Sequence, residues 1–186
     1  MKPIRKYSDD KLVAACRNNN RQAQRQLYEL YSQPMFNVCY RILNQQEAAE
    51  DALQEAFVKM FGQLHSFREE STFGAWFKRI VVNHALNHLN KEKRKVENLE
   101  HLKYEKAHSD IEEEDDSNLP NYTVSQIQNA MEHLPEGYRI VFSLYLFEEY
   151  SHRDIAQELS ITESTSKSQL NRAKRKIRQI LSEKVN

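Results

Sequence analysis

The sequence predicts an all-α protein with two small helical domains joined by an acidic flexible linker. The first observation is composition: the 186 residues include only 3 Gly and 4 Pro, and strand-favouring runs are short. The second is the recurrence of apolar residues every three or four positions, which is typical of amphipathic helices. The third is a change after Lys95, where residues 97–120 carry 9 acidic side chains against 2 basic ones.

Residues 1–96 are expected to form the first domain, beginning with two amphipathic helices. Ser8 and Asn20 each precede a stretch with helical spacing, so each is a candidate N-cap. Pro34 is expected to start or kink a third stretch, because proline removes one backbone hydrogen bond. Asn44 is expected to cap a fourth helix.

The fourth stretch, QQEAAEDALQEAFVKMFGQL, has an apolar stripe and a polar ridge. The stripe contains Ala49, Leu53, Ala56, Met60 and Leu64. The ridge contains Glu47, Glu50, Asp51, Gln54 and Glu55. Spacing alone describes the ridge as the exposed face of a helix.

The segment STFGAWFKRIVVNHALNHLNKEKRK, residues 71–95, is both aromatic and basic. At 100° per residue, one side is a core face with Phe77, Val81, Val82, Ala85 and Leu89. Another side gathers Trp76, Asn83, Asn87, Asn90 and Arg94. Rings, amides and cations together suit unpaired nucleic acid, in which bases stack on rings and phosphates attract cations. Periodicity equally fits a core Trp beside surface amides, with Phe67 in the core as well.

Residues 97–120 are expected to be a partly disordered linker, because they bury too little apolar surface to offset chain entropy. Residues 121–186 are expected to form the second domain. Its first helix places Val124, Ile127 and Met131 on one face and stops at Pro135. The next helix carries Ile140, Val141, Leu144 and Phe147.

The C-terminal stretch from Ser151 has the form of a helix-turn-helix. Ser151 and Asp154 form a candidate capping box, and Ser160 to Thr162 are expected to form the turn. The short first helix buries Ile155, Ala156 and Leu159, and the second buries Leu170, Ala173, Ile177 and Leu181. The polar face of the second helix contains Lys167, Ser168, Asn171, Arg172, Lys174, Arg175 and Arg178. A basic helix alone fits a solvated bundle surface, but the preceding helix and turn favour DNA recognition.

Other classes of protein find no support in the sequence. Cys16 and Cys39 lack paired spacing and are expected to be reduced core residues of a cytoplasmic protein. His84 and His88 are four residues apart but lack a third ligand, so no metal is expected. We find no nucleophile–base pattern and no phosphate-binding Gly loop, which argues against an enzyme and against a cofactor. No apolar run is long enough to span a bilayer.

Three blocks of sequence together resemble a known family: AAEDALQEAFVKMF, SFREESTFGAWFKRIVVNHALNHL, and LPEGYRIVFSLYLFEEYSHRDIAQELSITESTSKSQLNRAKRKI after the acidic linker. In order and spacing they resemble extracytoplasmic-function (ECF) sigma factors of the sigma-70 family. The resemblance implies that residues 1–96 are region 2, which binds core RNA polymerase and melts the minus-10 element. It implies that residues 121–186 are region 4, which binds the minus-35 duplex and the polymerase flap. The linker would thread through polymerase channels.

The resemblance also implies roles for individual residues. Polymerase binding falls on Glu50, Asp51, Gln54 and Glu55. Contacts with minus-10 DNA fall on Phe67, Trp76, Asn83 and Asn87. Contacts with minus-35 DNA fall on Lys167, Ser168, Asn171, Arg172 and Arg175. An anti-sigma factor is a common partner in this family, and restraint of the DNA-binding surfaces would come from another chain or from control of synthesis.

Three departures from the family pattern bear on the second helix and its minus-35 target. Ser166 stands where the family has a core Val, Gln169 where an Arg is common, and Ser160 where the turn often has Gly. They concern how the second helix docks and which bases it reads.

Two other functions remain as alternatives. A stand-alone helix-turn-helix activator or repressor explains residues 121–186 equally well, but not the acidic ridge followed by the Trp and Asn face. An RNA- or single-strand-binding structural protein explains that face alone. Binding to core polymerase without DNA separates the first alternative from a sigma factor, and preference for the non-template strand of a particular promoter separates the second.

Overall fold

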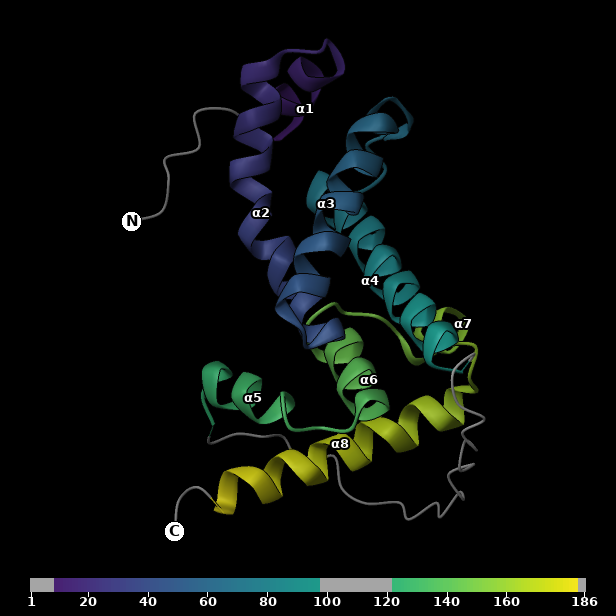
Figure 1. The fold of residues 1–186 in the computed structure, drawn as a ribbon. Coiled ribbons are helices and arrows are strands. Elements are labelled where there is room, and N and C mark those ends of the chain that lie inside the picture. Colours follow the sequence, from purple (N-terminus) through teal and green to yellow (C-terminus); the bar gives the residue numbers. More distant parts are fainter. Residues whose placement is uncertain (1–8, 98–121, 184–186) are drawn as a thin grey trace. The chain divides into compact units, whose positions relative to one another are not determined.

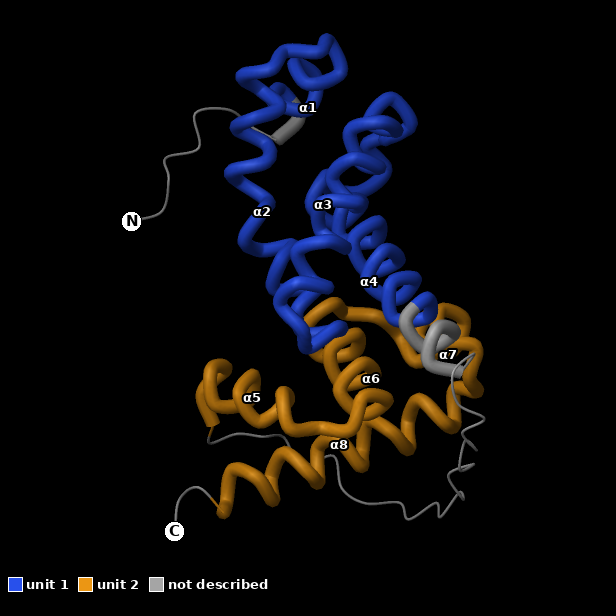
Figure 2. The backbone as a smooth tube through the Cα atoms, viewed as in Figure 1, with its two compact units in different colours: residues 1–96 blue, residues 97–186 orange. Residues whose placement is uncertain are grey.

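The computed structural model describes residues 9–97 and 122–183, and every regular element in these two ranges is a helix (Figure 1). The all-α prediction is therefore confirmed. The chain divides into two compact units, residues 1–96 and residues 97–186 (Figure 2). The predicted N-cap Ser8 and nearly all of the predicted linker lie outside the described residues.

Unit 1 begins with α1 (Asp9–Arg17) and continues with α2 (Arg21–Leu43), α3 (Gln46–Gly62), the single 3-10 turn η1 (Leu64–Ser66) and α4 (Phe73–Glu97). Asn20 caps α2 as predicted, because its side chain accepts a hydrogen bond from the backbone N–H of Ala23 at 3.0 Å. Figure 1 shows α1 at the same end of unit 1 as η1, and the two are in contact.

In unit 1 the structure excludes one of the two outcomes predicted for Pro34, a new helix start, and the boundary predicted at Asn44 was wrong. The helix α2 continues through Pro34 without a new start. Tyr31 and Met35 are both buried on either side of this proline, so the two halves of α2 share one core and packing outweighs the missing hydrogen bond. Asn44 ends α2 instead of starting α3: its φ of 56° is left-handed, and its N–H bonds to the carbonyl of Tyr40 at 2.8 Å.

The core of unit 1 is an aromatic cluster between α2, α3 and α4. The rings of Phe57 and Phe77 lie 4.8 Å apart, and the rings of Tyr31 and Phe73 lie 5.2 Å apart. A Cβ atom at Gly74 would lie 3.3 Å from the Tyr31 ring, so glycine permits this close approach. The predicted apolar stripe is confirmed as buried: Ala49, Leu53, Ala56, Met60 and Leu64.

Unit 2 contains α5 (Val124–Met131), α6 (Glu136–Leu146), α7 (His152–Leu159) and α8 (Glu163–Glu183). The long helix α8 packs against each of the other three (Figure 1). Val124 shares the predicted apolar face with Met131, yet it is 62% exposed. It is the first residue of α5, and only the last turn of that helix is buried. No helix in the described ranges is long and apolar enough to cross a membrane.

Candidate nucleic-acid interface

The turn between α7 and α8 is held by short-range caps. Ser151 Oγ accepts from the N–H of Asp154 at 3.2 Å, and the Asp154 carboxylate accepts from the N–H of Ser151 at 3.1 Å, so the predicted capping box is confirmed. Ser160 ends α7 with a φ of 54°, in the left-handed region that favours glycine. Thr162 Oγ1 then accepts from the N–H of Thr165 at 3.0 Å and starts α8. Each of these caps joins residues three positions apart.

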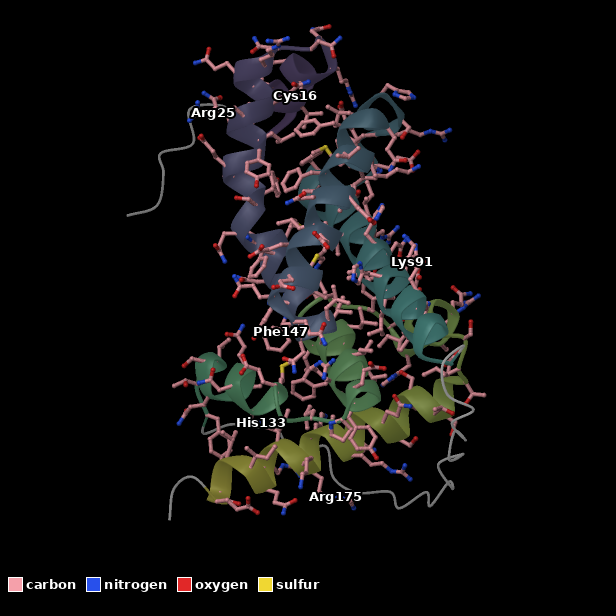
Figure 3. The ribbon with its side chains drawn as sticks, in the orientation of Figure 1. Cys16, Arg25, Lys91, His133, Phe147 and Arg175 are labelled. Atoms are coloured by element: carbon pink, nitrogen blue, oxygen red, sulfur yellow. The ribbon has the colours of Figure 1, made fainter. Side chains whose placement is uncertain are left out.

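The helix α8 turns one face to the core of unit 2 and one to solvent. The predicted buried stripe, Leu170, Ala173, Ile177 and Leu181, is buried. Of the residues predicted to touch the minus-35 element, Lys167, Asn171 and Arg175 are exposed, and Ser168 and Arg172 are half-buried. Figure 3 shows Arg175 on the side of α8 that faces away from α6. This exposed face carries donors for base edges and cations for phosphates.

Ser166, which stands where the family has an apolar residue, is fully buried and has a polar partner. Its Oγ lies 2.9 Å from Nδ1 of His152 in the first turn of α7. The ring of Tyr145, at the end of α6, stacks on the His152 ring with centroids 4.6 Å apart. A hydrogen bond and a ring stack therefore join α6, α7 and the start of α8.

The surroundings of His152 favour its neutral form. Burial lowers the pKa of His152 below its ordinary value, and Lys167 and Lys174 lower it further, while Glu163 acts in the opposite direction. The imidazole that supports Ser166 is therefore uncharged at neutral pH. The remaining departure, Gln169, lies against α6, because a Cβ at Gly137 would lie 3.3 Å from its amide oxygen.

In unit 1, the ridge residues Glu50, Asp51, Gln54 and Glu55 are all exposed along α3. Glu50 accepts a hydrogen bond from the amide of Gln46 at 2.9 Å. Glu55 lies 3.4 Å from Nδ1 of His84 on α4, and this contact joins the ridge to the next helix. The ridge therefore presents carboxylates to solvent at one end and links to α4 at the other.

The two predicted faces of α4 are distinct in the structure. On the core face, Phe77, Val81, Val82 and Ala85 are buried and Leu89 is half-buried. On the other face, Asn83, Asn87 and Asn90 are exposed, and Trp76 is half-buried. The side chain of Arg94 lies outside the described residues. Three exposed amides in a row leave this face open to a ligand.

Trp76 and Phe67 are brought together, although they come from different elements. Their ring centroids lie 5.1 Å apart, and Phe67 also meets the Phe73 ring at 5.7 Å. Phe67 itself is only 5% exposed, so its ring supports Trp76 and the segment of residues 64–70, here called the η1 loop. A direct contact between the Phe67 ring and minus-10 DNA stays a prediction.

Arg17, at the end of α1, holds the η1 loop and was missed by sequence reasoning. Its guanidinium donates to the carbonyl oxygens of Phe67 at 2.5 Å and Leu64 at 3.3 Å, and it pairs with the Glu69 carboxylate at 3.0 Å. Its carbon Cζ lies 5.9 Å from the centroid of the Phe67 ring. These partners are 47 to 52 residues away in the chain, so no local pattern indicates them.

No group of three or more His, Cys, Asp or Glu side chains converges on a metal-sized site within the described residues. His84 faces Glu55 instead of His88. Cys16 and Cys39 are buried free thiols, and burial raises the pKa of Cys16 to about 11.

Both units correspond to parts of one protein family. Residues 27–95 match the family description "Sigma-70 region 2", and residues 125–177 match "Sigma-70, region 4". The first match covers the ridge and the face of α4, and the second covers the helix-turn-helix. The chain belongs to the sigma-70 family of RNA polymerase sigma factors.

Similar proteins extend this match over nearly the whole chain. The RNA polymerase sigma-H factor of Pseudomonas aeruginosa is 29% identical over 176 residues, which is 91% of each chain. The ECF RNA polymerase sigma factor SigW of Bacillus subtilis is 26% identical over 178 residues, covering 92% of this chain and 95% of that one. The resemblance to ECF sigma factors, and with it the prediction of a sigma factor, is confirmed.

Solved structures agree on the fold. The sigma factor RpoE from Bartonella quintana, described in complex with the anti-sigma factor NepR, superposes with a TM-score of 0.55 at 20% identity. The superposition covers 85% of this chain and 96% of that one. At this identity the likeness concerns the fold.

Proposed function

We propose that unit 1 binds core RNA polymerase through the exposed ridge of Glu50, Asp51, Gln54 and Glu55. Carboxylates on a rigid helix suit a basic partner surface, because charge complementarity guides docking and sets its register. All four side chains are exposed on α3, and this exposure supports the assignment. In this proposal the ridge selects polymerase, and the DNA-binding surfaces select the promoter.

The face of α4 with Trp76, Asn83 and Asn87 captures the minus-10 strand after a base leaves the duplex. Asn83 and Asn87 offer amides for base edges, and Trp76 offers the exposed part of its ring for stacking. The buried Phe67 ring packs against Trp76 and supports it. Extrusion of a base costs a few kcal/mol, and binding of the extruded base offsets that cost. The single observation that carries this role is that two exposed side chains, Asn83 and Asn87, lie on the same face of α4 as the half-buried Trp76.

The exposed face of α8 binds the minus-35 element as duplex DNA. Lys167, Asn171 and Arg175 are exposed on α8, the second helix of the capped helix-turn-helix, and Ser168 and Arg172 lie beside them. The first residues of such a helix reach base edges, and the cations bind phosphates. The hydroxyl of Ser168 donates to the carbonyl of Thr165 at 3.0 Å, so towards a base it acts as an acceptor.

The remaining roles follow from the same assignment. The chain supplies recognition, and polymerase supplies the catalysis, so the protein acts in the cytoplasm where polymerase and promoter meet. Residues 97–120 join units 1 and 2 through the polymerase channels, where their acidic side chains take the place of nucleic acid. An anti-sigma factor, like the one described for the Bartonella quintana relative, restrains the protein by covering its surfaces.

Run-off transcription from a pool of genomic fragments, with core polymerase alone and with this protein added, tests the proposal. A sigma factor yields new transcripts that begin at a small set of shared promoter sequences. A stand-alone regulator instead binds duplex DNA without polymerase and yields no transcripts with core polymerase alone. A general single-strand binder changes no start site. The absence of new start sites, together with failure to bind core polymerase, contradicts the proposal.

A further inference from the structure

Arg17 reaches the η1 loop from α1 with every part of its guanidinium group. Nη2 and Nε donate to two different backbone carbonyls, those of Phe67 and Leu64, and Nη1 pairs with Glu69. A planar fork with donors at fixed angles suits such a divided set of acceptors, and a lysine ammonium does not. One side chain therefore fixes the start, middle and end of the loop at once.

The η1 loop combines local backbone hydrogen bonds with one residue in a strained conformation. Within residues 66–70, the backbone N–H of Phe67 bonds to Leu64 at 3.3 Å and that of Ser66 bonds to Gln63 at 2.9 Å. Glu69 adopts a φ of 62°, in the left-handed region that a residue with a Cβ rarely enters. Such a conformation persists when surrounding contacts determine it, and Arg17 supplies one of those contacts.

The loop in turn sets the position of the Phe67 ring, which packs against Trp76 on α4. Phe67 sits between the Arg17 guanidinium, 5.9 Å from its centroid, and the ring of Trp76, 5.1 Å from its centroid. A shift of the loop therefore moves Phe67, one of the two phenylalanine rings that pack against Trp76; the other is Phe73, at 5.7 Å. Arg17, α1 and the aromatic pair form one continuous series of contacts.

We propose that Arg17 is a positioning residue for capture of the minus-10 strand, acting through the η1 loop and the Phe67–Trp76 pair. The inference rests on the proposed function of α4. Arg17 need not touch DNA: it holds the loop in the geometry that a flipped base meets. Its two bonds to carbonyls carry this effect, and the exposed pair with Glu69 adds little, as is usual for ion pairs in water.

The test compares four full-length variants in complex with core polymerase: Arg17→Ala, Arg17→Lys, Glu69→Gln and the control Arg25→Ala. Arg25 forms an exposed pair with Glu29 at 2.9 Å on α2, and it is labelled in Figure 3. The control removes the same charge from the same unit without touching the loop. The probe is a labelled single-stranded oligonucleotide with the non-template sequence of a promoter recovered by run-off transcription.

We expect Arg17→Ala to weaken binding of the oligonucleotide about tenfold, or ~1.4 kcal/mol, while affinity for core polymerase and for a minus-35 duplex stays within about twofold of the parent protein. Arg17→Lys should recover part of the loss, because an ammonium keeps the charge but not the fork. Glu69→Gln and Arg25→Ala should match the parent protein. Unchanged oligonucleotide binding by Arg17→Ala, or an equal loss of polymerase binding, overturns the inference.

Hydrogen exchange of the free chain separates this inference from the proposed function. Arg17→Ala should increase exchange in peptides that cover residues 63–70, and Arg25→Ala should not. Unaltered exchange in this segment overturns the inference even where the parent protein directs transcription. If the parent protein itself fails to bind core polymerase, the proposed function fails and the role of Arg17 in strand capture fails with it, whatever the exchange data show.

Discussion

The η1 loop of unit 1 and the α7–α8 turn of unit 2 both lead into a helix that we propose contacts promoter DNA, but different interactions hold them. The α7–α8 turn is closed by caps between residues three positions apart, such as Ser151 with Asp154 and Thr162 with Thr165. The η1 loop is closed by Arg17, whose partners lie about 50 residues away. The helix proposed to read duplex DNA is thus positioned by local hydrogen bonds, whereas the face proposed to capture a single strand depends on a tertiary contact.

This difference predicts how each region fails. In the α7–α8 turn, removal of one of several independent caps should lower stability by only about 1 kcal/mol, because the other caps remain. In the η1 loop a single side chain, Arg17, binds two backbone carbonyls at once, so its loss is expected to affect the contacts from Phe67 to Trp76 together.

Loss of one amide on α4 should abolish most strand capture while leaving the fold intact. Asn83→Ala removes an exposed side chain, so core polymerase should still bind. Open complexes, measured by reactivity of unpaired thymines, should fall at least tenfold, since a well-placed contact to a base contributes about 1–3 kcal/mol. Asn90→Ala, also exposed on α4, is the control. Loss of polymerase binding in Asn83→Ala would mark this residue as structural.

Removal of a cation from α8 should affect duplex binding and its salt dependence. Arg172→Ala is expected to weaken binding to a minus-35 duplex and to lower the magnitude of the salt slope by about 1, because one phosphate contact is lost. Fluorescence anisotropy across a salt series measures both. Arg25→Ala, in unit 1, should leave the slope unchanged. A steeper slope in Arg172→Ala contradicts the assignment.

The caps should give equal and moderate effects in the two units. Ser151→Ala removes the cap of α7, and Asn20→Ala removes the cap of α2. Each should lower the free energy of unfolding by about 1 kcal/mol, measured by denaturant titration. Asn20→Asp keeps the side-chain acceptor and is the matched control. A loss above roughly 3 kcal/mol from Ser151→Ala would show that the turn depends on this one cap.

Unit 2 should lose stability as pH falls below 6.5. The pKa of His152 is lowered in the folded chain, so between that lowered value and 6.5 the unfolded chain binds a proton that the folded chain does not, and unfolding is favoured. His152→Phe keeps a ring against Tyr145 and should flatten this part of the pH profile. The comparison concerns the slope, because Ser166 loses its partner in the variant. An equal slope in both proteins excludes His152 as the cause.

The smallest expected effect concerns Cys16. A pKa of about 11 leaves about one thiol in a thousand ionised at pH 8, so alkylation of the folded chain should be slow. Mass spectrometry after iodoacetamide treatment, with and without denaturant, measures the protection. Rapid modification of Cys16 without denaturant would mean that α1 opens readily, and with it the support of the η1 loop.

The two units also differ in how much of them the sequence predicts. The capping box of Ser151 and Asp154 and the buried stripe of α8 follow from spacings of three and four residues, and both are confirmed. Arg17 could not be identified in this way, because the sequence around a single arginine does not indicate hydrogen-bond partners that lie 47 to 50 residues away. A contact between residues so far apart in the sequence depends on the packing of α1 beside η1, and this packing is determined by the whole unit.

The errors at Pro34 and Asn44 have the same origin on a smaller scale. Asparagine serves as an N-cap in the extended region and ends helices in the left-handed region, and only the backbone conformation at Asn44 separates these uses. Proline usually ends a helix, yet burial of Tyr31 and Met35 keeps α2 continuous. Within the site, the helical periodicity of the sequence predicted the core and exposed faces of α4 correctly. It could not show that the Phe67 ring packs against Trp76.

The position of Trp76 has a spectroscopic consequence. It is the only tryptophan in the sequence, so indole emission from the isolated chain originates at one place. That place is half-buried, 5.1 Å from Phe67 and on the same helix as the exposed Asn side chains. A base that stacks on the indole would quench its emission directly. The protein therefore carries a built-in optical probe, with which the proposed strand capture can be tested in real time without a label.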